Sequence, residues 1–107
     1  MLIYISGRIK NNDNYREDFK NAEQWLKLNG YRPINTVAIG DSMPQLTYEQ
    51  YMQLDYRLID IADGIYMLTG WQKSKGAKAE LAYAKSLKKK IYYQSYYKGF
   101  KSTGTEQ

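Results

Sequence analysis

The chain of 107 residues is long enough for one domain, because domains usually hold about 100 to 150 residues. It contains neither histidine nor cysteine, which excludes a Ser-His-Asp or Cys-His catalytic site, a thiolate zinc site and a disulfide. The net charge of +5 arises in the last third, where nine lysines and two glutamates follow residue 70.

A strand and a helix open the chain. Residues 2–5 are β-branched, apolar or aromatic and stop at Ser6 and Gly7, which is typical of a buried strand that leaves the sheet through a tight turn. The following helix is predicted by apolar residues at spacings of three and four, and it ends where Asn29 and Gly30 break the pattern. Its inward side chains are Phe19, Ala22 and Leu26.

A weaker strand and a second helix occupy the middle of the chain. Pro33 interrupts the strand predicted over residues 31–37, and residues 38–46 are expected to form a loop because they include glycine and proline. Thr47 followed by Gln50 matches a capping box, so a helix is predicted to begin there. The apolar face of this helix is assigned to Tyr51, Leu54, Leu58 and Ile61.

The last third continues the alternation of strand and helix. Residues 65–69 form the strongest strand of the sequence, and a loop over residues 70–76 leads into a helix predicted to run to about residue 89. A final strand is predicted over residues 91–93. Residues 94–107 are polar and lack periodicity, so a mobile tail or an arm toward a partner is expected. The inward side chains of the helix are assigned to Ala77, Leu81, Ala84 and Leu87.

Strands that alternate with helices at this spacing predict an α/β fold. The expected architecture has three layers, with a parallel sheet of four to five strands between helices on both faces. Ligands of such sheets bind beyond the carboxyl ends of the strands, near the point where the strand order reverses. Residues 6–9 and 70–76 are therefore expected to form neighbouring rims of one site, in a domain that spans residues 1–93.

The short apolar runs and the basic last third of the chain suggest its cellular location and its partners. No run approaches the roughly 20 apolar residues that cross a bilayer, and the first residues lack a signal-peptide pattern. We therefore expect a soluble, cytoplasmic protein with no membrane partner. The lysines of the last third favour a phosphate-bearing partner. That they only form the solvated end of a helix is an equally good explanation.

The loop before the third helix has the features of an anion site. Ser74 and the free amides of a helix N-terminus accommodate an anion, and Lys73, Lys75 and Lys78 add positive charge. Glu80 follows in the first turns of the helix. An acidic residue at that place also complements the helix dipole, and this simpler role stays open.

The end of the first strand is a second candidate for ligand contact. It carries no Gly-x-Gly-x-x-Gly fingerprint, so a dinucleotide cofactor is not expected. Ser6 and the backbone of Gly7 are placed to touch a sugar or a phosphate, and an ordinary strand-end turn is the alternative.

Asp55 is the second candidate carboxylate. It lies one position past Leu54, beside the predicted apolar face of its helix, and is placed to point toward the rim of the sheet. Asp60 is expected to face solvent, and Asp63 to be a turn residue at the helix end. Two carboxylates that reach one pocket from different helices, in a chain without histidine or cysteine, suit the cleavage of a glycosidic bond.

Four short motifs carry a resemblance to a known group of enzymes. They are residues 3–7 (IYISG), Asp55 followed by residues 62–63 (AD), residues 74–76 (SKG) and residues 80–84 (ELAYA). Over about residues 1–93 the chain resembles the nucleoside 2-deoxyribosyltransferase superfamily, and among characterised members the 2'-deoxynucleoside 5'-phosphate N-hydrolases. The resemblance implies a flavodoxin-like fold, a reaction without metal or cofactor, and a homo-oligomer, a dimer or larger, in which a neighbouring subunit completes the site.

The resemblance assigns roles to individual positions. Glu80 falls on the nucleophile that attacks C1' of the sugar, and Asp55 on the carboxylate that binds the sugar or assists the departing base. Ser74 matches a serine that holds the 5'-phosphate. Arg8 stands where many short members have proline, and Lys78 where the hydrolases tend to have glycine. The expected substrate-binding residues are Tyr4, Ser6, Gly7, Arg8, Ser74, Gly76 and Lys78.

The leading expectation is cleavage or transfer of the N-glycosidic bond of a nucleotide or nucleoside. A protein that binds a nucleotide in the same pocket without turnover is the alternative. A nucleic-acid partner is least expected, because the tyrosines that would stack on bases also fit a buried strand and an interface. These tyrosines are Tyr92, Tyr93, Tyr96 and Tyr97.

Overall fold

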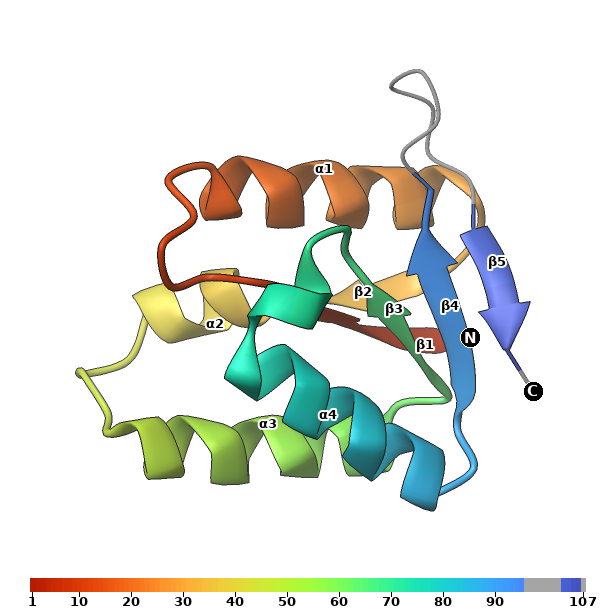
Figure 1. Cartoon of the computed structure of the whole chain (residues 1–107). Coiled ribbons are helices and arrows are strands. Elements are labelled where there is room, and N and C mark those ends of the chain that lie inside the picture. Colours follow the sequence, from red (N-terminus) through yellow and green to blue (C-terminus); the bar gives the residue numbers. More distant parts are fainter. Residues whose placement is uncertain (96–102, 107) are drawn as a thin grey trace.

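A five-stranded sheet forms the middle layer of the computed structural model, in which residues 1–95 and 103–106 are described (Figure 1). The strand order is β2-β1-β3-β4-β5; β1 to β4 run parallel and β5 is antiparallel to β4. The strands are β1 (Leu2–Ser6), β2 (Arg32–Ile34), β3 (Gly64–Met67), β4 (Lys90–Gln94) and β5 (Thr103–Glu106). The α/β class expected from the sequence is confirmed, and the strand order reverses between β1 and β3.

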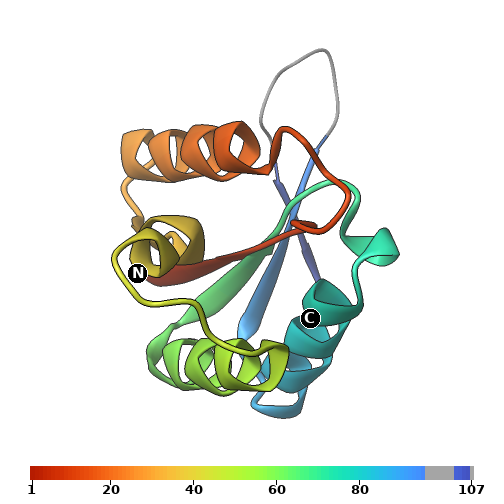
Figure 2. The same ribbon diagram turned by 90° about the vertical axis from the view of Figure 1, so that its left-hand side faces the viewer.

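Helices cover both faces of the sheet, with α1 on one face and α3 and α4 on the other (Figure 1, Figure 2). The helices are α1 (Tyr15–Leu28), α2 (Thr36–Asp41), α3 (Tyr48–Ile61), α4 (Lys75–Ser86) and the short 3₁₀ helix η1 (Trp71–Lys73). The short helix α2 follows β2, and it touches both cores because Val37 packs on one and Ile39 on the other. In the described part of the chain, no helix has the length and apolar character to cross a membrane.

The pleat of β1 divides its side chains between two cores. Ile3 and Ile5 pack against the inward face of α1, which is the face predicted from the sequence. Tyr4 lies in the opposite core, beneath α3 and α4. Ser6 shares the face of Tyr4, because side chains two residues apart on a strand point the same way. The strand therefore presents two hydroxyl groups to α4.

The prediction of a loop over residues 38–46 is wrong for residues 38–41, because they belong to α2. The side chain of Asn35 accepts hydrogen bonds from the amides of Val37 at 3.0 Å and Ala38 at 3.3 Å, which satisfies two free N–H groups of the first turn. This cap starts the helix despite Gly40 in its last turn.

The second predicted helix begins as expected, but its buried face is rotated. Both hydrogen bonds of the capping box at Thr47 are present. Met52 and Ile59 are buried, whereas Ile61 is 64% exposed, so the assignment of Ile61 to the apolar face is wrong. Asp55 lies three residues after Met52 and four before Ile59, which places it on the inward face itself rather than beside it.

The C-terminal elements also differ in detail from the prediction. Helix α4 ends before Leu87, which is 41% exposed, so its assignment as an inward residue is wrong; Ala77, Leu81 and Ala84 are buried as expected. Within the segment 94–107, expected to be a tail or an arm, β5 pairs with β4. Tyr96 and Tyr97 lie outside the described residues.

Gly7 lies where the chain leaves β1, and a side chain has no room there. An added Cβ would lie 2.9 Å from Cδ1 and 3.0 Å from Cβ of the buried Leu68. We expect Gly7→Ala to lower the free energy of unfolding by about 1–3 kcal/mol, measured by urea denaturation. Gly40→Ala is the control, because nothing lies within 4 Å of a Cβ at that position. Equal losses in the two variants would contradict the steric explanation.

Candidate active site

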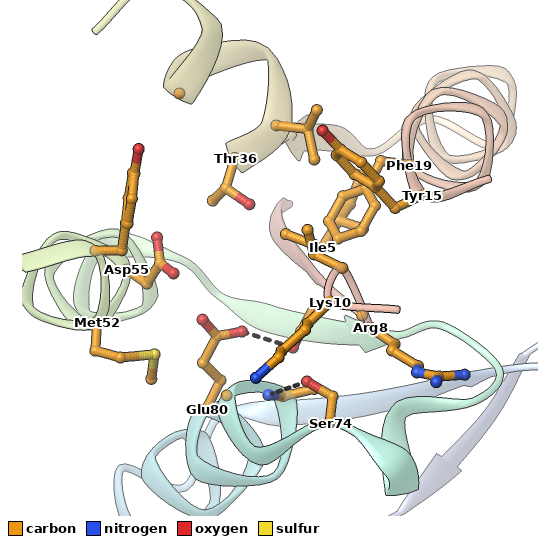
Figure 3. Close-up of a pocket in the computed structure, with 18 of the residues that line it drawn as sticks. Ile5, Arg8, Lys10, Tyr15, Phe19, Thr36, Met52, Asp55, Ser74 and Glu80 are labelled. Atoms are coloured by element: carbon orange, nitrogen blue, oxygen red, sulfur yellow. Dashed lines mark hydrogen bonds between the residues drawn. The ribbon is translucent and has the colours of Figure 1, made fainter. Parts of the chain in front are cut away.

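A cavity of about 850 Å³ lies at the carboxyl ends of β1 and β3, where the strand order reverses. Its walls come from α1, α2, α3, the start of α4 and the loops after β1 and β3 (Figure 3). The two predicted rims meet here, since residues 6–9 and 73–76 line the same cavity. The predicted site residues in its lining are Tyr4, Ser6, Gly7, Arg8, Asp55, Ser74, Gly76 and Glu80.

Glu80 is a buried acid with both carboxylate oxygens held. It lies three residues after Ala77 and four before Ala84, on the inward face of α4, and only 6% of its surface is exposed. The Ser6 hydroxyl donates to Oε1 at 2.6 Å, and the Tyr4 hydroxyl donates to Oε2 at 3.0 Å. The two donors come from one face of β1, so the strand fixes the orientation of the carboxylate.

Asp55 extends from α3 toward the same cavity and is half-buried (Figure 3). Its charge raises the pKa of Glu80 and of Tyr4, so its carboxyl group is a close neighbour of both. Two neighbouring carboxylates repel each other unless they share a proton. The geometry therefore favours a pair that carries one proton between them.

The pKa values of this cluster follow from burial and mutual repulsion. Burial raises the pKa of Glu80 well above its ordinary value, and the hydrogen bond with Asp55 and the charge of Asp55 raise it further. Burial also raises the pKa of Asp55. The pKa of Tyr4 is raised well above its ordinary value by burial and by the charges of Glu80 and Asp55, so its phenol remains a proton donor. Perturbed carboxyl groups that share a cavity are typical of catalytic sites.

Thr36 joins α2 to this cluster. Its side chain lines the cavity near the Tyr4 phenol and lowers the pKa of Tyr4. Thr36 is thus a neighbour of Tyr4, and the Tyr4 hydroxyl in turn donates to Glu80. Thr36 is the first residue of α2, so the Asn35 cap places it at the cavity.

Loss of the Thr36 hydroxyl is expected to lower stability, because Tyr4 loses a polar neighbour. We expect Thr36→Val to lower the free energy of unfolding by about 1 kcal/mol, the net value of one hydrogen bond, as measured by urea denaturation. Thr36→Ser keeps the hydroxyl and should lose less. If Thr36→Ser loses as much as Thr36→Val, packing of the methyl group is responsible instead.

Positive charge gathers where the loops after β1 and β3 meet. Ser74 is the N-cap of α4, and its hydroxyl accepts a hydrogen bond from the amide of Ala77 at 3.0 Å, which leaves its own proton to donate. Arg8 lines the cavity and is half-buried. Lys78 is exposed and does not line the cavity, so its expected contact with substrate has no support from the structure. Two residues before Glu80 on a helix, it points to the other side.

Two other acids considered in the sequence have structural roles. Asp60 is half-buried rather than solvent-facing, since it accepts a hydrogen bond from the Tyr83 hydroxyl at 2.5 Å and pairs with Arg57 at 2.9 Å. Asp63 accepts a hydrogen bond from the backbone amide of Leu2 at 2.8 Å, in agreement with a place in a turn. Among the described residues, no group of three or more acids is placed to hold a metal ion.

The sequence interpretation missed the walls that α1, α2 and the start of α3 supply. A signal existed for α2, because residues after β2 lie at the same edge of a parallel sheet as those after β1. No sequence signal marks the side chains of α1 and α3 that line the cavity, because their distance from it depends on how each whole helix is tilted against the sheet. The missed residues include Lys10, Tyr15, Thr36, Tyr48, Tyr51 and Met52.

Comparisons with known proteins agree with this fold. The family model described as "Domain of unknown function (DUF4406)" matches residues 1–93. No curated protein matches the chain. The CMP N-glycosidase of Clostridium botulinum has a TM-score of 0.63 and 18% identity, over 87% of this chain and 67% of that chain. The 2-desoxiribosyltransferase from Leishmania mexicana has a TM-score of 0.66 and 22% identity, over 88% of this chain and 63% of that chain.

The chain therefore spans about two thirds of the length of these two proteins. Their likeness confirms the fold that the resemblance to nucleoside 2-deoxyribosyltransferases predicts.

Proposed function

The chain belongs to the DUF4406 family, and we propose that it cleaves or transfers the N-glycosidic bond of a nucleotide or nucleoside. The observation that carries the proposal is the presence of Glu80 and Asp55, two carboxyl groups from different helices, in one cavity, where Asp55 raises the pKa of Glu80. Glycosidic cleavage uses such a pair, one group at the anomeric carbon and one at the leaving group. The names of the two solved structures, an N-glycosidase and a deoxyribosyltransferase, support this class of reaction.

Glu80 is the proposed nucleophile. The hydroxyls of Tyr4 and Ser6 donate to its two oxygens and lower its pKa against the effect of burial, so they favour its ionised form. They also hold the carboxylate in one orientation, which contributes to the rate by aligning it with the reacting carbon. An oxygen of Glu80 forms a bond to C1' as the bond from C1' to the base nitrogen breaks.

Asp55 is the proposed acid. The resting pair keeps its proton on Glu80, whose pKa burial and Asp55 raise. Transfer of this proton to Asp55 ionises the nucleophile, and Asp55 then donates the proton to the departing base. Ionised Asp55 then accepts a proton from water, or from the acceptor of a transfer, as that group displaces Glu80 from C1'. Protons and charges balance over the cycle, and the pair returns to one shared proton.

The proximity of the two carboxyl groups favours this covalent route. A pair that activates water directly stands about 6.5–9.5 Å apart, with the water and sugar between them, whereas a pair that forms a covalent intermediate stands about 5–5.5 Å apart. The charge of Asp55 raises the pKa of Glu80, as expected for close neighbours. We therefore propose retention of configuration at C1'.

A panel assay tests the proposed function. The protein is incubated with the common ribo- and deoxyribonucleosides and their 5'-phosphates, and free base is measured by chromatography. Release from at least one member supports the proposal. If calorimetry shows binding and no member releases base after prolonged incubation, the chain is a nucleotide-binding protein and the proposal fails.

A further inference from the structure

The cavity holds more positive charge than one phosphate group needs. Among the described residues, five cationic side chains line it, and two are already engaged. Arg16 pairs with Asp41 at 2.6 Å, and the Lys75 ammonium lies 5.3 Å from the centre of the Tyr48 ring. The remaining three are Arg8, Lys10 and Lys73.

Arg8, Lys10 and Lys73 form no ion pair in the described part of the chain. Within the part of the chain that the structure describes, none of the three side chains has a hydrogen bond or an ion pair. Arg8 is half-buried as a residue and lines the cavity without a hydrogen-bonded or ion-paired partner for its side chain. A bound anion supplies the missing partner, and arginine is suited to phosphate because its donors form a planar fork.

The three cations lie beside the place that the proposed reaction gives to the sugar. Arg8 and Lys10 follow β1, Lys73 precedes Ser74, and Arg8, Lys10 and Ser74 border the cavity that holds Glu80 (Figure 3). The amides at the start of α4 add about half a positive charge. The Asp55–Glu80 pair with its shared proton brings one negative charge to the same cavity, and a single phosphate ester carries about −1.5 to −2 at neutral pH. About half to one positive charge therefore remains unmatched when one phosphate is bound.

We propose that the preferred ligand is a nucleoside 5'-phosphate with two or more phosphates, the first near Ser74 and the next near Arg8. This inference rests on the proposed function, since Glu80 and Asp55 locate the sugar. The cavity of about 850 Å³ falls within the common range for small-molecule sites and accommodates the longer chain.

Binding measurements test the proposal without relying on turnover. Calorimetry compares inorganic phosphate with inorganic pyrophosphate, and the 5'-monophosphates with the 5'-diphosphates of the four common deoxynucleosides. We expect the diphosphate and pyrophosphate to bind about tenfold more tightly or better. Arg8→Gln should remove most of this preference, because it weakens diphosphate binding far more than monophosphate binding. Arg32→Gln is the matched control, because Arg32 is exposed and does not line the cavity.

The outcomes separate this inference from the proposed function. Equal binding of mono- and diphosphates, or equal effects of Arg8→Gln and Arg32→Gln, would overturn the inference. Release of base from monophosphates with no preference for diphosphates rejects the inference and leaves the proposed function intact. Preferential binding of diphosphates without release of base rejects the proposed function and retains the phosphate-chain site.

Discussion

Replacement of Glu80 by glutamine is expected to reduce the rate of base release by about a thousandfold or more, as loss of a nucleophile does. Glutamine keeps the shape of the side chain, and its amide still hydrogen-bonds to the hydroxyls of Tyr4 and Ser6, but it has no carboxylate to attack C1'. The measurement is single-turnover release of base, by chromatography, from whichever nucleotide the wild type cleaves. Glu17→Gln, at an exposed site on α1, is the matched control and should leave the rate unchanged.

The same variant should gain stability at neutral pH, which separates loss of chemistry from loss of folding. Burial and Asp55 raise the pKa of Glu80, so the folded protein keeps its proton at a pH where the unfolded chain ionises. The stability linked to this proton is fully present below the unfolded pKa and falls as the pH rises through the folded pKa. Glutamine does not ionise, so the stability of Glu80→Gln does not fall in this way as the pH rises. Urea denaturation at pH 7 should therefore show Glu80→Gln to be more stable than wild type, with a smaller difference near pH 4.

Lower stability of Glu80→Gln at pH 7 would indicate that the ionised carboxylate stabilises the fold. Glu80 would then have a structural role, and the lost activity would no longer identify a nucleophile.

Local patterns in the sequence predict much of the fold. The inward face of α1 and the capping box of α3 depend on residues within three or four positions of each other, and both are confirmed. The apolar face predicted for α3 differs from the buried one, because a hydrophobic pattern does not distinguish a residue of the core from one that lines a cavity. Tyr51 and Leu54 line the cavity and remain half-exposed. Asp55 occupies an inward position that the hydrophobic pattern alone gives to an apolar residue.

The candidate site depends on contacts between distant segments. The rule that ligands bind at the carboxyl ends of parallel strands brings Ser6 and Ser74 to one cavity, and the structure agrees. The hydrogen bonds from Tyr4 and Ser6 to Glu80 span more than 70 residues, so no local pattern reveals them. Thr36 was missed for a related reason, since its role depends on a helix that one asparagine caps.

Replacement of Asp55 by asparagine is expected to lower kcat by about 100- to 1,000-fold, the usual contribution of a general acid. Asparagine has a similar shape but no proton to give to the departing base. The charge of Asp55 and its hydrogen bond raise the pKa of Glu80, so this variant should lower that pKa. Because attack requires ionised Glu80, the acid limb of the pH profile of kcat should move to lower pH.

A substrate that needs no acid distinguishes proton donation from a general structural role of Asp55. A 7-methylguanine nucleotide has a positively charged base that departs without further protonation. Asp55→Asn should therefore lose little activity on this substrate relative to the unmodified nucleotide, whereas Glu80→Gln should lose activity on both. Equal losses of Asp55→Asn on the two substrates would contradict the acid role, because a residue that only positions the sugar affects both leaving groups alike. In that case the shared proton would serve only to relieve repulsion between the two carboxyl groups.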